Sequence, residues 1–427
     1  MKTPVLLHFA CAALIAPAFS QEPRPAAYET GVMLPAASLL PVESLIGPSY
    51  RVRDQVPTDG YMAHFTIDSD FGSMTAVGVP QAKQRIIEAE AIRKLVETSK
   101  GDLFAEGMKR SIEQPIDAVK NIVKNPVDSL KAAPATVGHF FGKMGSAIGR
   151  AGGKVKDQMQ EASENPDAAD SDAAAQAGRG IGNAAKNAAG FDKAKLDVAK
   201  QLGVDPYSDN ARLHEEMEKV TWAFFAGGLP LRVGAAVASA GVAVVATKMV
   251  GIPEETYALT QAELALRDGR SLASMGISDE DIKTFQLYGP LSTTRRHRIT
   301  LALEAMPKTK GRGHVIVLAN ACETPEQADF LIGALAILAE RQRSGAAAYD
   351  ELKVIGRLPG AMTAGGELQV PAPVDHVTWT EDVAAFAIRD DLGTAPKLLV
   401  HTGRISQAAA EGLTNAGWKT AAVEYPR

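Results

Sequence analysis

Cysteine is nearly absent from this sequence. Its 427 residues include only two cysteines, Cys11 and Cys322. Cys11 lies in an N-terminal segment that we expect to be removed on export, so the mature chain would keep Cys322 alone. A single cysteine excludes a disulfide within the chain, even in an oxidising compartment. Stability must then come from a buried apolar core, and the length suffices for two or three domains.

The sequence also lacks a strong excess of charge of either sign. It has 45 Lys and Arg against 50 Asp and Glu, a formal net charge of −5. Nucleic-acid-binding domains usually carry a clearly basic surface. The balance therefore argues against a nucleic-acid partner.

The common catalytic and metal-binding motifs are missing. There is no G-x-S-x-G elbow, no P-loop, no H-E-x-x-H and no pair of cysteine ligands. His214 begins a zinc-helix pattern, but Glu218 stands where the second histidine should be. Asp68 and Asp70 share a turn that lacks the further ligands of a calcium loop. We expect neither a metal nor a cofactor.

The N-terminus has the pattern of a secretory signal peptide. Lys2 precedes an apolar run over 5–18, and small residues at Ala18 and Ser20 suit cleavage after residue 20. The run is shorter than the roughly 20 residues that span a bilayer. Residues 1–20 therefore predict export through the secretory pathway, to the periplasm or out of the cell, with membrane association left open.

The rest of the chain predicts an α+β fold that is predominantly helical. Residues 21–48 are expected to form an extended lead-in. In 49–99, runs at 50–53, 62–67 and 74–77, separated by Asp- and Gly-containing turns, predict a β-meander, and Pro80 suits the first turn of a helix that follows.

Residues 158–192 have almost no large apolar side chains and predict a flexible linker. A helical domain is expected over 193–345. Within it, 229–250 is an apolar stretch whose uncharged core, 233–247, is short for a membrane span. Two alternatives stay open for this stretch, a buried core helix and a membrane-inserting segment.

The last part, 346–427, alternates strands with short helices and predicts a small α/β layer of the βαβαβ type. We expect a hairpin of 352–355 with 367–370. Strands should follow at 374–379, 397–401 and 418–423, with helices at 381–388 and 405–415 between them.

Residues 100–157 form an amphipathic, glycine-striped helical region. A Pro-x-Asp pattern at Pro115 recurs at Pro126, and an 11-residue period keeps apolar residues on one helical face. Glycine is a poor helix former in water, so a stripe of glycines favours close approach of another helix. Within 105–157, the residues expected to contact a membrane surface or a protein partner are Lys120, Lys124, Lys131, Gly138, Phe140, Phe141, Gly142, Gly145 and Gly149. The alternative is that this region packs across the protein's own core.

Two further groups are candidate sites. His376 and His401 belong to neighbouring predicted strands, with Asp375 beside the first. Catalytic groups gather at the carboxyl ends of such strands, and Cys322 could supply a nucleophile. A lone buried cysteine more often behaves as a small apolar side chain. Arg295, Arg296 and Arg298 form a basic cluster for an anion, or a solvated helix face.

Two functions follow from these patterns. The first is an exported, envelope-associated binding or structural protein that contacts a membrane surface or a partner helix through 105–157. The alternative is an exported hydrolase-like enzyme with its site in the C-terminal α/β layer. Fold class alone does not decide between them.

Overall fold

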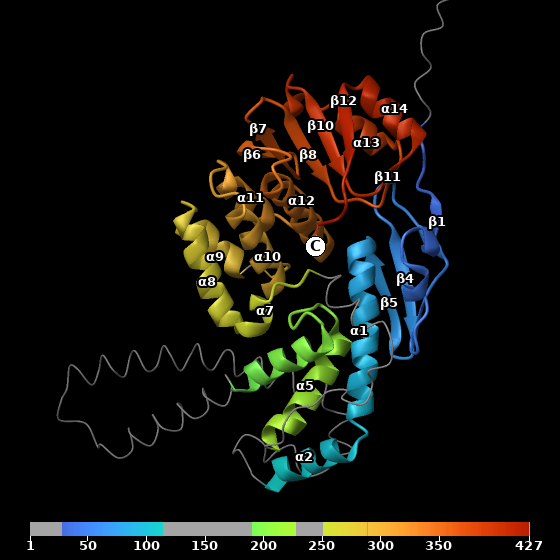
Figure 1. Cartoon of the computed structure of the whole chain (residues 1–427), viewed down its shortest axis with the longest axis vertical. Helices are drawn as coiled ribbons and strands as arrows, with labels where there is room; N and C mark the ends of the chain where they lie inside the picture. The colour runs from blue at the N-terminus through green and yellow to red at the C-terminus, as the bar shows by residue number, and fades with distance from the viewer. Residues whose placement is uncertain (1–27, 114–189, 228–250, 288, 427) are drawn as a thin grey trace, which may run out of the picture.

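The computed structural model describes residues 28–113, 190–227, 251–287 and 289–426 (Figure 1). The predicted signal peptide (1–20), most of the glycine-striped region and linker (within 114–189) and the whole apolar stretch (229–250) lie outside the described residues.

The N-terminal part is a three-stranded antiparallel sheet covered by a long helix. Strands β2 (Tyr50–Val52), β4 (His64–Ser69) and β5 (Gly72–Val77) pair in sequence order. Helix α1 (Val79–Thr98) buries Ile86 against Phe65 and Ile67 of the sheet. The meander and helix expected within 49–99 are present. In addition, β1 (Met33–Pro35), inside the predicted lead-in, pairs with β3 (Gln55–Pro57).

A group of helices continues from the far end of α1. Helix α2 (Asp102–Glu113), a helix over 190–202 and α5 (Ala211–Ala226) share one core with the end of α1. Leu95, Phe104, Leu213 and Phe224 are buried there.

A second helical group leads to the C-terminal sheet. It comprises α7 (Glu255–Ala258), α8 (Gln261–Ser274), α9 (Asp279–Leu287), α10 (Thr293–Glu304), α11 (Arg312–Asn320) and α12 (Pro325–Arg343). Helices α8, α10 and α12 begin after Thr260, Ser292 and Thr324, whose hydroxyls accept hydrogen bonds from free backbone N–H groups in the first turn.

The C-terminal sheet has five strands of mixed direction. They are β6 (Tyr349–Ile355), β7 (Leu358–Thr363), β8 (Leu368–Ala372), β10 (Lys397–His401) and β12 (Trp418–Ala422), in the spatial order β12-β10-β8-β7-β6. Strands β8, β10 and β12 run parallel and are linked through α13 (Glu381–Ala387) and α14 (Gln407–Asn415). Strands β6, β7 and β8 form an antiparallel meander.

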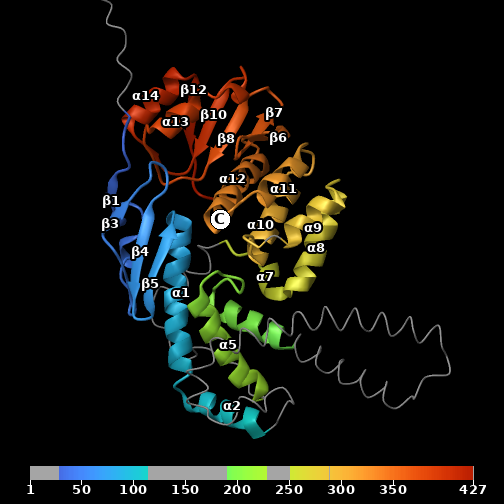
Figure 2. The ribbon, with the colours of Figure 1, turned by 180° about the vertical axis from the view of Figure 1, so that it is seen from behind.

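Helices cover both faces of this sheet (Figures 1 and 2). Leu368 and Val370 of β8 pack into a core with Leu413 of α14. Gln369 points to the opposite face, where it accepts a hydrogen bond from Arg341 of α12 at 3.1 Å. Every residue of β8 is buried, as expected for a central strand between two helical layers.

The expectation of a predominantly helical fold was wrong. Helix takes up 50% of the structure and strand 19%, in several sheets, so the class is mixed α+β. The sequence pattern concealed β7, because Pro359 and Gly360 are residues that strands usually avoid. The strand expected at 374–379 is also not part of the large sheet. Only β9 (His376–Val377) forms there, paired with β11 (Arg404–Ile405), and the strand of the large sheet that precedes α13 is β8.

A network of ion pairs joins α1, α10 and α12. Arg295 of α10 donates to both carboxylate oxygens of Asp329 on α12, at 2.8 and 2.9 Å, and to Asp209 at 3.2 Å. Arg85 of α1 donates to the other oxygen of Asp209 and to Glu88, at 2.5 and 2.8 Å. The two guanidinium groups are about nine-tenths buried, so the carboxylates are needed to compensate their charge.

We predict that Arg295→Met destabilises the protein by about 2–4 kcal/mol, because it leaves Asp329 without its cation and Asp209 with Arg85 alone. The exposed Arg343 pairs with Glu340 on the surface, and Arg343→Met should cost less than about 1 kcal/mol. Urea unfolding of the two variants checks this. Equal losses would show that the network contributes no more than a surface pair.

Asp205 is a buried carboxyl that accepts from the Thr294 hydroxyl at 2.5 Å and the Tyr207 N–H at 2.8 Å. Burial raises its pKa to about 6, against the opposing effect of these hydrogen bonds. The carboxyl group of Asp205 therefore binds its proton more tightly in the folded state than in the unfolded state. The resulting stabilisation is complete below about pH 4 and is lost as the pH rises through about 6.

We predict that wild type loses stability relative to Asp205→Asn between pH 4 and pH 7, by up to about 3 kcal/mol, because the amide does not titrate. Urea unfolding of both proteins at pH 4, 5.5 and 7 measures the difference. A difference that does not change with pH would contradict the raised pKa.

Candidate functional site

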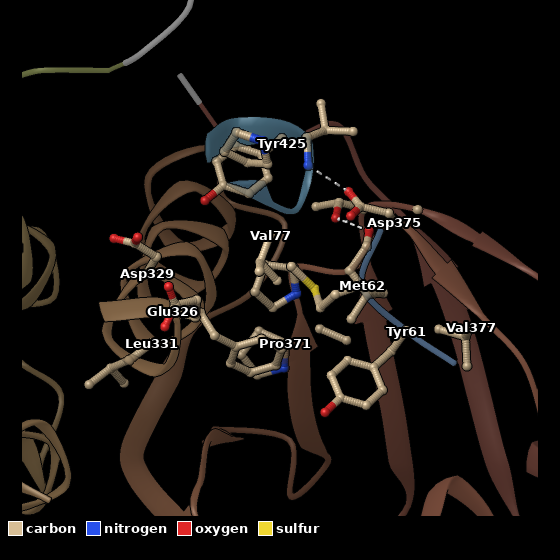
Figure 3. A pocket seen from close by; sticks show the side chains of 18 of the residues that line it. Tyr61, Met62, Val77, Glu326, Asp329, Leu331, Pro371, Asp375, Val377 and Tyr425 are labelled. Carbon is tan, nitrogen blue, oxygen red and sulfur yellow. Dashed lines mark hydrogen bonds between the residues drawn. The ribbon is translucent and has the colours of Figure 1, made fainter. Parts of the chain in front are cut away.

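A cleft of about 1430 Å³ lies at the carboxyl ends of β8, β10 and β12 (Figure 3). Residues that follow these strands form one wall, including Asp375, Thr402 and Tyr425. The start of α12 forms a second wall with Glu326 and Asp329. The β-meander and the start of α1 form a third wall. The carboxyl edge of a parallel sheet is the usual place for a ligand in α/β folds.

Two prolines explain why the sheet opens at this point. Strands β7 and β8 pair through Ala361 with Gln369, and through Met362 with Leu368. The same register would place Pro359 opposite Pro371, and neither residue has an N–H to donate. The ladder ends there, and both proline rings line the cleft.

Asp375 fixes the wall formed by the meander and α1. Its carboxylate accepts from the backbone N–H of Ala63 at 2.9 Å and from that of Val79, the first residue of α1, at 3.1 Å (Figure 3). The backbone N–H groups of Asp375 and His376 both donate to the carbonyl of Tyr61. Burial raises the pKa of Asp375, and the two N–H donors oppose this. The carboxylate therefore acts as a cap for a helix about 300 residues earlier in the chain.

The loops after β8 and β10 are held in close contact. The Thr402 hydroxyl donates to the carbonyl of Val374 at 2.8 Å. A Cβ atom at Gly403 would lie 2.2 Å from the carbonyl oxygen of Asp375, so only glycine fits there. This contact fixes the position of Arg404 at the edge of the cleft.

Two of the four predicted catalytic residues line the cleft, and no contact between these two is among their hydrogen bonds in the described residues. Asp375 and Cys322 line the cleft, whereas His376 and His401 do not. His401 Nδ1 lies 2.7 Å from the carbonyl oxygen of Gly403, and burial, with Arg404, lowers the pKa of His376. Burial raises the pKa of Cys322, which favours the unreactive thiol. In the described residues, no hydrogen bond joins Cys322 to either histidine.

The three arginines of the predicted anion site have different environments. Arg295 is held by Asp329 and Asp209, as described above. The Nε atom of Arg296 donates to the carbonyl of Phe285 at 2.8 Å. Arg298 alone lines the cleft, where its positive charge opposes the rise that burial causes in the pKa of Tyr425. The cluster therefore does not present its three guanidinium groups to a common anion.

The residues of the meander that face the cleft are not among the site residues predicted from the sequence. Asp59 accepts from the N–H groups of Tyr61 and Met62, and its other oxygen lies 2.9 Å from His64 Nε2. These four residues line the cleft. The Asp59-Gly60 pair indicated a turn, but nothing local indicated that the turn faces a strand edge more than 300 residues away.

In the part of the chain that the structure describes, no group of three or more His, Cys, Asp or Glu side chains could hold a metal ion. No helix of that part is both long enough and apolar enough to cross a membrane. Comparison with known proteins gives no match to a family model, a curated protein or a solved structure.

We predict that Asp375→Ala destabilises the protein by about 2–4 kcal/mol, because two buried N–H groups lose their acceptor. Asp375→Asn keeps one acceptor oxygen and should therefore lose less stability than Asp375→Ala does. Asp350→Ala, at an exposed aspartate outside the cleft, is the matched control. Thermal unfolding ranks the three variants, and a loss for Asp375→Ala no larger than the control would contradict the role of Asp375 as a cap.

Proposed function

We propose that this protein is an exported binding protein that holds a largely apolar organic ligand in the cleft. The observation that carries the proposal is the cleft itself, which lies at the carboxyl edge of the sheet and has walls from parts of the chain far apart in sequence. Export rests on the signal-peptide pattern of residues 1–20.

The lining supports an apolar, extended ligand. Met62, Phe330, Leu331, Pro371 and Phe386 all border the cleft, and charged groups of both signs accompany them. Pockets for drug-sized molecules are typically about 300–1,000 Å³, apolar, with a few polar groups that fix orientation. A space of about 1430 Å³ exceeds that range and suits a chain-like ligand.

Binding is better supported than hydrolysis. The observation in favour of an enzyme is the His64–Asp59 pair, because a histidine oriented by a carboxylate can act as a general base. A nucleophile should lie within hydrogen-bond reach of that base. Among the described residues, no Ser, Thr or Cys side chain is hydrogen-bonded to His64, and the Cys322 thiol has a raised pKa.

Contact with a membrane surface or partner helix through 105–157 stays a separate part of the proposal. Helix α2 contains the described start of this region. Its Phe104 is buried in the core with α5, and its Leu103 is 58% exposed. The glycine stripe and its flanking lysines carry the remainder of this proposal from sequence alone.

The binding proposal predicts that the neutral apolar dye Nile red binds the wild-type protein with a rise in fluorescence. Met62→Arg should weaken this binding about tenfold or more, because the variant places a charge in an apolar wall. Met33→Arg makes the same change at an exposed position outside the cleft and should bind as wild type does. Failure of wild type to bind the dye, or equal binding by the two variants, would contradict the proposed site.

A further inference from the structure

The segment that follows β12 turns back into the cleft. The Val423 N–H donates to the carbonyl of His401 at 2.8 Å, and Glu424, Tyr425 and Pro426 all line the cleft. In two opposite views this segment leaves the sheet and ends in the middle of the molecule, between α12 and α1 (Figures 1 and 2). Part of the proposed ligand site is therefore occupied by the protein's own chain.

Tyr425 lies in a slot between α12 and the loop after β8. A Cβ atom at Gly333 of α12 would be 2.7 Å from the Tyr425 hydroxyl and 2.8 Å from Cβ of Pro373. A larger residue at position 333 would fill the slot, so the glycine makes room for the tyrosine. Figure 3 shows the hydroxyl end of Tyr425 directed to the side of the cleft where Asp329 lies.

The slot also satisfies the polar end of the tyrosine. Arg298 is the cation that interacts with the hydroxyl. Burial raises the pKa of Tyr425, an effect that Arg298 opposes and that Asp329 and Asp375 add to. A slot formed by Gly333 and Pro373, with a cation that interacts with the hydroxyl, suits a phenol ring and its hydroxyl group.

The tyrosine uses only part of the available space. The cleft measures about 1430 Å³ with the segment in place. The cleft is also lined by charged side chains of both signs, Arg404, Glu326 and Asp382. These could pair with opposite charges on a polypeptide chain. A polypeptide with apolar side chains and a few charges matches a largely apolar lining that also carries charges of both signs.

We infer that the cleft recognises a tyrosine-bearing polypeptide segment of a partner protein, and that residues 423–426 are a built-in occupant which this partner segment displaces. The inference rests on the proposed binding function and names its ligand class. It also gives the site a means of regulation, because an intramolecular segment competes at a high effective concentration.

A labelled peptide with the sequence of residues 421–427 and blocked ends tests the inference against the full-length protein. Tyr425→Ala empties the slot, and this variant should bind the peptide at least about tenfold more tightly than wild type does, since it has lost the competing side chain. Tyr28→Ala is the matched control, because Tyr28 is 55% exposed and lies outside the cleft, and it should bind as wild type does. Fluorescence anisotropy measures all three affinities.

The peptide itself carries the second control. With Phe in place of its tyrosine, the affinity of the peptide for Tyr425→Ala should fall about three- to tenfold, because phenylalanine lacks the hydroxyl that interacts with Arg298. Adding Arg298→Leu to the Tyr425→Ala protein should abolish the difference in affinity between the tyrosine and phenylalanine peptides. With Ala in place of the tyrosine, the peptide should not bind measurably.

Several outcomes would overturn the inference. One is that wild type and Tyr425→Ala bind the tyrosine peptide with equal affinity. Another is that Tyr425→Ala binds the tyrosine and alanine peptides with equal affinity. A wild-type dimer that Tyr425→Ala abolishes would make a second copy the occupant. Nile red binding without peptide binding would overturn this inference alone, whereas loss of both would also overturn the proposed function.

If Tyr425→Ala fails to fold, hydrogen exchange of the wild-type protein answers the same question. An excess of the tyrosine peptide should speed exchange at Val423, whose N–H is bonded to His401, by displacing the segment. The alanine peptide should have no such effect, and equal exchange with both peptides would contradict displacement.

Discussion

The carboxylate of Asp375 is the interaction on which the arrangement of this molecule depends. It lies directly after the turn that leaves β8, and it accepts the N–H groups of Ala63 and Val79 from the N-terminal part. A buried carboxylate is costly unless hydrogen bonds compensate it. Satisfying Asp375 therefore holds the β-meander and the start of α1 against the edge of the C-terminal sheet.

The cleft is a consequence of that arrangement. Pro359 and Pro371 end the pairing of β7 with β8, so the sheet opens at the same edge that Asp375 ties to α1. Two glycines permit close contact around the opening. Gly403 lies against the backbone of Asp375, and Gly333 makes room for Tyr425. The space is thus set by backbone chemistry as much as by the side chains that face it.

Much of the local structure could be predicted from sequence. Alternating patterns and turn residues located β4 and β5, and Pro80 lies in the first turn of α1. Strands β10 and β12 were located for the same reason. Strand β7 was missed because its Pro and Gly obscure the pattern. The idea that functional groups gather at strand ends pointed to the edge of the sheet where the cleft lies. Of the residues that it selected there, Asp375 lines the cleft, whereas His376 and His401 do not.

The sequence by itself determined the features that depend on neighbouring residues: the turns, the helix starts and the pattern of an export signal. Only the tertiary structure decided which residues form the site. The hydrogen-bond partners of Asp375 lie 296 and 312 residues away, and the slot of Tyr425 is made by Gly333 and Pro373. Such contacts form between surfaces that meet only after the chain has folded, so no periodicity or local spacing records them.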